Sequence, residues 1–376
     1  MKLTLSEDQL FFRETTQRFL DDHASVAELR RRRDDVAGFG ADYWRRGAEL
    51  GWTSFLVREE DGGGSISGEG LVDLAIVAHE IGAHAAPGPL VPVNVVAGAL
   101  SRAGGHADVL AGLLDGTATA SWCLAEQHAR AIVPTGLEIE QRGDGFVLRG
   151  VKRPVESAGE ASHLLVTGRT GDGLTQVLVP TDAPGVTVTP LKTVDLTRRF
   201  SAVSFDDVQV PASAVIGEVG NAAADVELQL QQALVLVSAE CTGAMQSAFD
   251  MTVQWAFDRY TFGRPLASYQ ALKHRFADMK SWVEAAHAIS DEAADAVAAV
   301  TPTAASLVSA AKAYVGDTGG ALMQECVQLH GGLGVTYEHD VHLFLRRQTV
   351  NQTLFGTAIQ HRARLTDLAE LQEKAA

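Results

Sequence analysis

Two stretches in the C-terminal half of the chain decide its fold: RYTFGRPL at residues 259–266 and QLHGGLGV at residues 328–335. Both lie in a region, beginning at about residue 219, in which apolar side chains recur every three or four positions, as is typical of amphipathic helices. Few helix-breaking residues interrupt this region, so it predicts a bundle of long helices. The recurring apolar residues are Leu230, Leu234, Val237, Cys241 and Met245 in one run, and Leu272, Phe276, Met279, Val283 and Ala286 in another.

The sequence changes character at about residue 119. Residues 119–218 contain short β-rich stretches, such as HLLVT at 163–167, separated by Gly, Asp and Pro turns. The part before residue 119 has helical spacing, and Ser6 followed by Gln9 predicts a helix that begins with a capping box. We therefore expect an α+β protein with three parts. These are an N-terminal helical domain at 1–118, a middle β-barrel or β-sandwich domain at 119–218, and a C-terminal helical bundle domain at 219–376.

Length, charge and cysteine content exclude several classes of protein. A chain of 376 residues is long enough for two or three domains. The 31 basic and 47 acidic residues give a formal net charge of −16, which argues against nucleic-acid binding because that needs a positive surface. The three cysteines Cys123, Cys241 and Cys326 lie far apart and predict buried free thiols, not a metal site. No basic segment precedes an apolar run at the N-terminus, so we expect a cytoplasmic protein without membrane contact.

Together with the helix–strand–helix order, the two quoted stretches resemble the acyl-CoA dehydrogenase family. The resemblance covers nearly the whole chain, and DGGG at residues 61–64 and FDDVQVP at residues 205–211 also look like family stretches. It implies a C-terminal four-helix bundle, FAD as the cofactor and an acyl-CoA thioester as the substrate. In the family, the two C-terminal segments reach across a subunit interface and hold the ADP half of the neighbour's FAD. The positions that match are Arg259, Thr261, Phe262, Gln270, Gln328, Gly331 and Gly332.

The chemistry of these residues suits a pyrophosphate. The Arg259 guanidinium is a planar fork that binds phosphate oxygens bidentately. Gln328 supplies an amide, and the Gly-Gly pair at 331–332 has no Cβ, so a cofactor can approach the main chain closely. The alternative is that the Gly-Gly pair is only a turn between helices and that Arg259 pairs with Asp258 or Asp278.

The catalytic base of the family is absent from both of its usual positions. The reaction needs a carboxylate that removes the α-proton of the acyl-CoA while the β-hydride goes to the flavin. The usual Glu position, directly before Gly-Thr, is held here by Phe355, and the alternative position on the preceding helix is held by Ala233. Neither side chain accepts a proton, so general-base catalysis cannot operate at either position. The family's Asp-x-x-Arg, which helps to hold CoA, reads QQAL at residues 231–234.

The middle domain also lacks the residues that face the flavin in the family. No Gly-Ser-Asp segment follows residues 124–128. The family's Gly-x-Lys-x-aromatic-Ile-Ser/Thr-Asn reads GVKRPVES at residues 150–157, so Glu156 replaces a hydroxyl that would touch the flavin. A carboxylate beside a ring that becomes anionic on reduction is adverse by about 1 kcal/mol if the site is wet, and by more if it is dry.

All of these losses fall in the chain's own active site, whereas the residues that it would give to a neighbour are present. This asymmetry is similar to the non-catalytic subunits of heteromeric α2β2 acyl-CoA dehydrogenases that act on steroid side-chain and dicarboxylic acyl-CoA substrates. We therefore expect the chain to pair with a homologous catalytic subunit in β-oxidation of a lipid or steroid, as a heterotetramer that shares FAD across an interface. An acceptor similar to electron-transfer flavoprotein is compatible with the resemblance.

Two alternatives stay open on the sequence. The first is a homomeric FAD enzyme with a relocated base, for which Glu240 and Glu156 are the candidates. Glu240 lies two helical turns from Ala233, about 10 Å away, which is too far without repacking of the site. The second is a non-redox scaffold that binds an acyl-CoA or a protein and holds no flavin.

Overall fold

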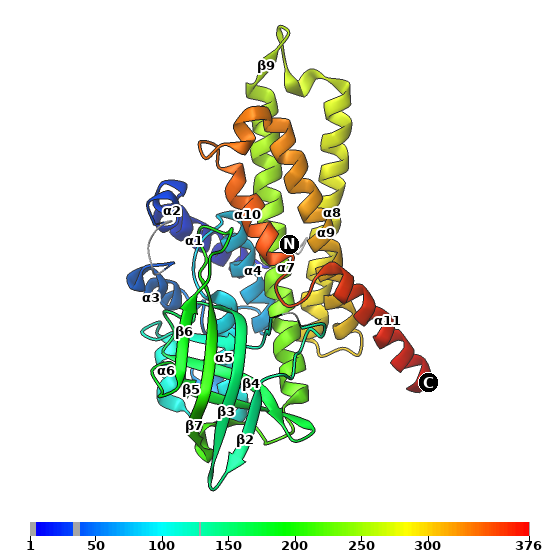
Figure 1. Ribbon diagram of the computed structural model, residues 1–376. Coiled ribbons are helices and arrows are strands. Elements are labelled where there is room, and N and C mark those ends of the chain that lie inside the picture. Colours follow the sequence, from blue (N-terminus) through cyan, green and yellow to red (C-terminus); the bar gives the residue numbers. More distant parts are fainter. Residues whose placement is uncertain (1–4, 33–37, 128, 376) are drawn as a thin grey trace.

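The computed structural model of the chain describes residues 5–32, 38–127 and 129–375, and its elements run from helices through strands to helices (Figure 1). The N-terminal helices are α1 (Glu7–His23), α2 (Val26–Arg32), α3 (Ala41–Glu49), α4 (Gly70–Ala83), α5 (Leu90–Ala103) and α6 (Ala107–Leu114). The strands that follow are β1 (Ala120–Cys123), β2 (Glu138–Arg142), β3 (Gly145–Glu156), β4 (His163–Thr170), β5 (Gly173–Pro180), β6 (Val186–Pro190), β7 (Phe200–Pro211) and β8 (Val215–Ile216). The C-terminal elements are α7 (Ala223–Asp258), the short strands β9 (Tyr260–Thr261) and β10 (Arg264–Pro265), α8 (Gln270–Ala298), α9 (Ala304–His330), the 3-10 turn η4 (Gly331–Val335), α10 (Val341–Asn351) and α11 (Ala358–Ala375).

The first helix begins as its sequence predicts. The Ser6 hydroxyl accepts from the Gln9 backbone N–H at 3.2 Å, and the Gln9 side chain accepts from the Ser6 N–H at 3.1 Å. Two donors that the helix itself leaves unpaired are thereby satisfied. The capping box is confirmed.

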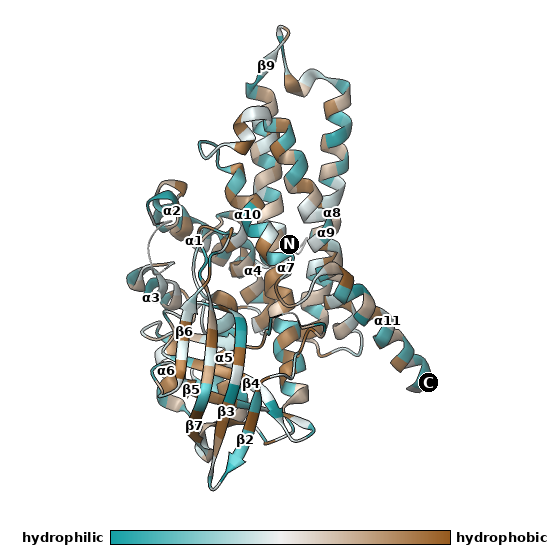
Figure 2. Cartoon of the chain, viewed as in Figure 1, coloured by the Kyte–Doolittle hydropathy of each residue, from teal (hydrophilic) through white to brown (hydrophobic). Residues whose placement is uncertain are grey.

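The middle region is one eight-stranded mixed sheet in the order β6-β7-β3-β2-β4-β5-β8, with β1 paired to β4. Successive side chains of a strand point to opposite faces, and in β4 and β5 both faces are buried. In β4, Leu164 and Val166 lie in a core enclosed by the strands, whereas Leu165 lies in the larger core shared with the helices. The hydropathy colouring shows hydrophobic residues along these strands (Figure 2). The sheet therefore encloses one core and covers another.

The C-terminal helices α7, α8, α9 and α10 pack beside one another, and α7 also contacts α4 of the N-terminal part. Figure 1 shows the β9–β10 hairpin at the free end of this bundle, and α11 projecting from the bundle near its other end. The order of N-terminal helices, middle sheet and C-terminal helical bundle confirms the predicted fold class. No helix among the described residues is both long and apolar enough to cross a membrane.

Two glycines allow α4 and α7 to touch along their backbones. A Cβ added at Gly82 would lie 1.9 Å from the carbonyl oxygen of Glu240, and one added at Gly243 would lie 1.9 Å from the carbonyl oxygen of His79. Both separations are far below van der Waals contact, so no side chain fits at either position. This contact fixes the distance between the N-terminal helices and the bundle, and it brings Glu240 close to α4.

We predict that Gly243→Ala separates α4 from α7 and lowers the free energy of unfolding by about 1–3 kcal/mol or more, as overpacking of a core does. The matched control is Gly316→Ala in α9, because a Cβ there meets its nearest neighbour only at 3.9 Å. The control should be neutral or stabilising by about 0.5–1 kcal/mol through helix propensity. Urea unfolding of both variants checks this, and equal stability of the two would show that the α4–α7 contact is looser than described.

Candidate functional site

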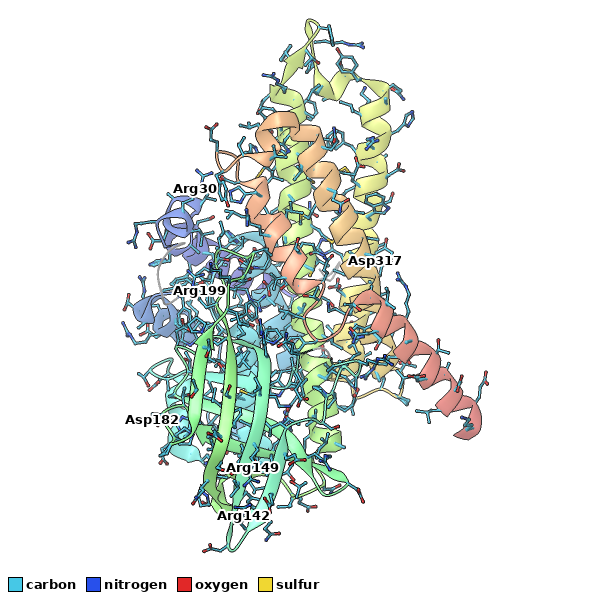
Figure 3. The ribbon with its side chains drawn as sticks, viewed as in Figure 1. Arg30, Arg142, Arg149, Asp182, Arg199 and Asp317 are labelled. Atoms are coloured by element: carbon cyan, nitrogen blue, oxygen red, sulfur yellow. The ribbon has the colours of Figure 1, made fainter. Side chains whose placement is uncertain are left out.

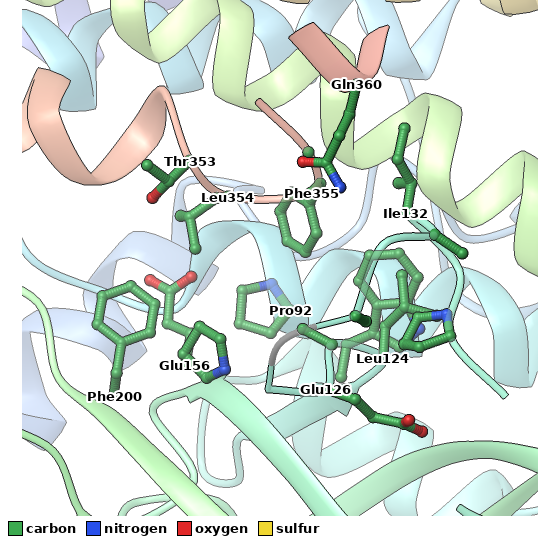
Figure 4. A pocket seen from close by; sticks show the side chains of 17 residues that line it. Pro92, Leu124, Glu126, Ile132, Glu156, Phe200, Thr353, Leu354, Phe355 and Gln360 are labelled. Atoms are coloured by element: carbon green, nitrogen blue, oxygen red, sulfur yellow. The ribbon is translucent and has the colours of Figure 1, made fainter. Parts of the chain in front are cut away.

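A cavity of about 260 Å³ lies between the sheet and the loop that joins α10 to α11. Its wall is mainly apolar and includes Trp122, Leu124 and Phe200 from the sheet region and Phe355 from the loop. Glu156, at the end of β3, presents its carboxylate beside Phe200 and Leu354 (Figure 4). The structure thus brings Phe355 and Glu156, which sequence reasoning placed in the chain's own active site, to one cavity.

Phe355 is fixed in the cavity wall by its backbone and its ring. Its φ of +56° is in the left-handed region, which is unfavourable for a residue with a Cβ. Its ring lies 5.3 Å from the Trp122 ring, and its carbonyl oxygen accepts a hydrogen bond from His361 Nε2 at 3.0 Å. Burial lowers the pKa of His361 to about 4, so this imidazole is neutral at physiological pH. Position 355 therefore offers the cavity a fixed apolar ring and no proton acceptor.

The alternative base position is not at the cavity. Ala233 is fully buried in α7 within the large hydrophobic core. It is not among the residues that line the cavity. A carboxylate at residue 233 would need partners in this apolar environment, and the methyl group present needs none.

Glu156 is held by a bidentate ion pair with Arg198. Arg198 Nε donates to one carboxylate oxygen at 2.7 Å and its Nη2 donates to the other at 2.5 Å. Burial raises the pKa of Glu156 above its ordinary value, and Arg198 opposes this rise. The pairing alters the electrostatic expectation from the sequence, because Arg198 neutralises the charge that would have been adverse beside a reduced flavin. Sequence reasoning missed Arg198, which lies 42 residues away in the chain.

The Glu156–Arg198 pair is the outer end of a buried charge network. Arg198 also donates to Asn351 Oδ1 at 2.7 Å and approaches Glu240 at 3.4 Å. Glu240 accepts in turn from Arg347 Nη1 at 2.5 Å. With guanidinium groups on two sides, Glu240 is engaged within the network and does not line the cavity.

Arg347 of α10 is fully buried and joins the three parts of the chain. Its Nε donates to Asp195 at 2.6 Å, and its Nη2 donates to Thr197 Oγ1 at 2.5 Å, both in the segment between β6 and β7. The same Nη2 donates to the backbone carbonyls at 85–86, which follow α4. Burial would raise the pKa of Asp195, but Arg347 and Arg198 outweigh it and hold that pKa below its ordinary value.

Residues of the loop at 126–136 line the cavity, and the buried Lys152 binds the first residue of this loop, Glu126. Lys152 Nζ donates to Glu126 at 2.7 Å and to the Leu124 carbonyl at 3.1 Å. Glu126 also accepts from the backbone N–H groups of Gly136 and Leu137, at 2.9 and 3.0 Å. Both ends of the loop are therefore tied to one carboxylate. The family's Gly-Ser-Asp segment would fall at this loop, in which His128 lies outside the described residues.

The seven residues predicted to serve a neighbour's cofactor gather at the free end of the bundle. Arg259 is exposed and forms no ion pair with a described residue, and its guanidinium lies 5.9 Å from the centre of the Trp255 ring. Gln328 and Gln270 are exposed at the ends of α9 and α8 that adjoin it. A Cβ added within the Gly-Gly pair at 331–332 meets nothing within 4 Å. The chain's own packing therefore does not require glycine at 332.

The β9–β10 hairpin presents Phe262 at its tip. Phe262 and Gly263 have φ of +49° and +81°, the pattern of a tight type I′ hairpin turn. Phe262 is 99% exposed, so side-chain packing against the described residues does not offset its unfavourable backbone conformation. Tyr269 stabilises the hairpin. Its hydroxyl donates to the Thr261 carbonyl at 2.9 Å, and the Arg264 guanidinium lies 3.9 Å from its ring centre.

Further large apolar side chains are exposed at the same end of the bundle. Soluble monomers rarely expose a cluster of large apolar side chains, and such a cluster indicates an interaction surface. We call this cluster the bundle-end patch. It consists of Phe257 at the end of α7 and of Tyr260 and Phe262 in the hairpin.

Comparison with known proteins identifies related chains. Three family models match: acyl-CoA dehydrogenase, N-terminal domain, at residues 6–116; middle domain, at residues 122–208; and C-terminal domain, at residues 224–367. The acyl-CoA dehydrogenase IpdE2 of Mycolicibacterium smegmatis is 29% identical over 363 residues, which cover 96% of this chain and 98% of that protein.

Solved structures agree with this match. A variant of the Tcur3481-Tcur3483 steroid acyl-CoA dehydrogenase superposes with a TM-score of 0.89 at 28% identity, covering 99% of this chain and 100% of that one. The ChsE4-ChsE5 complex from Mycobacterium tuberculosis contains a chain that superposes with a TM-score of 0.88 at 23% identity, covering 98% of each chain. At 23% identity, the similarity to the chain of the ChsE4-ChsE5 complex supports the fold alone.

The charge network extends to Lys312, and its titration can be measured. Lys312 Nζ is buried and donates to the Asn351 carbonyl at 2.7 Å, and burial lowers its pKa from 10.5 to about 8. Between these two values the unfolded chain binds more protons than the folded chain, so the contribution of Lys312 to stability rises with pH. We predict that the free energy of unfolding of the wild type, relative to Lys312→Met, increases by about 1–3 kcal/mol between pH 8 and pH 10.

Urea unfolding across this pH range checks the prediction. Lys280→Met, which removes an exposed lysine from α8, controls for the loss of one charge. A wild-type minus Lys312→Met difference that stays flat with pH would mean that Lys312 has an ordinary pKa in the folded protein.

Proposed function

The chain belongs to the acyl-CoA dehydrogenase family, and we propose that it is the non-catalytic subunit of a heteromeric member. In this proposal a homologous catalytic chain supplies the base and the flavin-ring pocket. This chain donates the contacts to the ADP half of that chain's FAD. The observation that carries the proposal is the contrast between a cavity without a base at Phe355 and an exposed Arg259 at the bundle end that has no ionic partner among the described residues.

The cavity supports the first half of the proposal. Phe355 presents only a ring, and both oxygens of Glu156 are bound by Arg198. Glu240 lies between two guanidinium groups outside the cavity. A base must accept the proton within hydrogen-bond reach, and an ion pair that stabilises the charged carboxylate opposes this. Glu126, the other carboxylate that lines the cavity, is bound by Lys152 and by the backbone N–H groups of Gly136 and Leu137.

The bundle end supports the second half. A guanidinium without an ionic partner, beside a backbone without Cβ, suits a pyrophosphate that needs charge and close approach. Arg259 would hold phosphate oxygens, with Gln328 and the main chain at 331–332 beside it. Thr261, Phe262 and Gln270 would contact the rest of the ADP moiety. The bundle-end patch would be covered by the neighbouring subunit.

When bound, FAD would supply the acceptor for the hydride that leaves the β-carbon of the acyl-CoA. This chain's own residues take no proton in that step. Their contribution is to bind and orient the cofactor and to exclude water from its ADP half. Binding and orientation lower the entropic cost of holding the cofactor in a productive position. The activity of the partner therefore depends on this chain, because this chain helps to keep FAD bound in the partner's site.

The relatives suggest the class of substrate. The matching steroid acyl-CoA dehydrogenase bears two protein names, and the second structural neighbour is a complex of two differently named chains. By analogy, we propose a bulky acyl-CoA, with a steroid or branched side chain, as the substrate of the complex. An electron-transfer flavoprotein would reoxidise the flavin.

A homomeric enzyme with Glu156 as a relocated base is the second candidate. The observation in its favour is that Glu156 lines the cavity and that burial raises its pKa towards the range useful in general-base catalysis. Against it stands the bidentate pair with Arg198, which would have to open before the carboxylate could accept a proton.

The isolated chain should show negligible acyl-CoA dehydrogenation with added FAD. Phe355→Glu should not restore it, because the family's flavin-facing hydroxyl and CoA-binding Asp-x-x-Arg are still missing. Turnover of a panel of acyl-CoAs with an artificial electron acceptor checks both. Rates ordinary for enzymes, about 1–10³ per second, from the unmodified chain would overturn the heteromeric assignment.

Arg259→Ala should weaken FAD binding by the complex about ten- to a hundredfold, because it removes a charge-assisted hydrogen-bond pair to phosphate. The melting temperature of the isolated chain should not change, since Arg259 has no ionic partner among the described residues. The measurement is flavin content after co-expression with a catalytic chain of the same genome that carries Glu before Gly-Thr and copurifies with this one.

The matched control is Arg142→Ala, an exposed arginine at the far end of the sheet (Figure 3). It changes the net charge equally and should leave flavin content unchanged. A fall in melting temperature of Arg259→Ala with flavin retained would make Arg259 a structural residue and remove the support for donation.

A further inference from the structure

A column of stacked groups joins the two segments at the bundle end. Trp255 of α7 stacks on His330 of α9, with ring centres 5.4 Å apart and planes inclined by 23°. The Arg259 guanidinium lies 5.9 Å from the Trp255 ring centre. His339 packs against His330, with ring centres 4.1 Å apart. His339 also lies 6.0 Å from the Trp255 ring centre, with planes inclined by 72°, so the three rings contact one another and Arg259 adjoins Trp255. We call this group of Arg259, Trp255, His330 and His339 the bundle-end column.

Hydrogen bonds fix the inner part of the column. His330 Nδ1 donates to the Cys326 carbonyl one turn back in α9, at 2.7 Å. Burial lowers the pKa of His330, and the neighbouring His339 lowers it further. A lowered pKa favours the uncharged imidazole, which does not repel the guanidinium that also adjoins Trp255.

The outer part of the column is held by the N-terminal helices. Arg30 of α2 donates to Asp340 at 2.5 Å and to the backbone carbonyls of Tyr337 and Glu338, at 3.1 and 2.9 Å. These residues flank His339, so the segment that carries it is fixed from outside the bundle. The column is thus supported at its His339 end and open at its Arg259 end.

We propose that Trp255 and His330 are positioning residues that hold the Arg259 guanidinium in place for the pyrophosphate of the neighbour's FAD. The inference rests on the proposed donation of FAD contacts. His330 directly precedes the Gly-Gly pair at 331–332, so the column also sets the distance between the guanidinium and that backbone. Two segments separated by about seventy residues in sequence thereby act as one binding surface.

The physical basis is preorganisation. An exposed arginine loses much rotamer freedom when it binds a phosphate. An aromatic face that already restrains the guanidinium reduces this loss and attracts the cation. Cation–π attraction at an exposed site corresponds to a factor of about two to five in affinity.

The experiment is a double-mutant cycle on FAD binding in the purified complex. Trp255→Leu should weaken FAD binding about two- to fivefold, and Trp255→Phe, which keeps an aromatic face, should weaken it by less than about twofold. In the Arg259→Ala background, Trp255→Leu should have no further effect, because the residue that it positions is gone. Phe249→Leu, which removes a buried aromatic ring of α7 outside the column, controls for loss of helix packing.

The outcomes separate the two hypotheses. If Arg259→Ala weakens FAD binding but Trp255→Leu does not, the proposed function stands and the positioning role is overturned. If the two effects add, Trp255 acts independently of Arg259, which also overturns it. If Arg259→Ala itself leaves FAD binding unchanged, the donation of FAD contacts fails and the positioning role fails with it. Equal losses of affinity from Trp255→Leu and Phe249→Leu would make Trp255 a packing residue only.

Discussion

The arrangement of the N-terminal helices, the sheet and the C-terminal bundle depends on the hydrogen bonds of the buried Arg347 guanidinium. It bonds the carbonyls at 85–86 after the N-terminal helices, Asp195 beside the sheet, and Glu240 within the bundle. Loss of one partner from such a buried pair leaves an uncompensated charge, at a cost of about 3–5 kcal/mol. Because Glu240 also approaches Arg198, and Arg198 holds Glu156, the same network sets the position of the cavity wall.

The cavity at Phe355 and the bundle end at Arg259 differ in whether their charged groups are paired within the chain. At the cavity, charges are paired internally, the covering loop is tied by Lys152 and Glu126, and Phe355 presents an apolar ring. At the bundle end, Arg259 has no ionic partner among the described residues, and Phe262 is fully exposed at an unfavourable φ. Carboxylates and guanidinium groups that are paired within the chain indicate a region that serves the fold, whereas an exposed arginine without an ionic partner among the described residues indicates a region that is completed by another molecule.

Local patterns in the sequence were enough to predict the fold class, and the family resemblance supplied the candidate residues of both regions. The capping box at Ser6, the alternation in the strands and the helical spacing after residue 219 each depend on neighbours along the chain. The partners of Glu156 and Glu240 could not be predicted in this way. Arg198 and Arg347 reach them from distant segments, and nothing in the sequence near either carboxylate indicates an ion pair. The same applies to the stacking of Trp255 on His330.

The most direct test of the account is the ratio of flavin to protein chains in the purified complex. Native mass spectrometry gives the number of each chain, and flavin absorbance after denaturation gives the number of cofactors. If this chain holds no flavin in its own cavity and completes the site of its partner, the complex contains one FAD for every two chains, and this chain purified alone is colourless. One FAD for every chain, or a yellow homomer of this chain, would contradict the account.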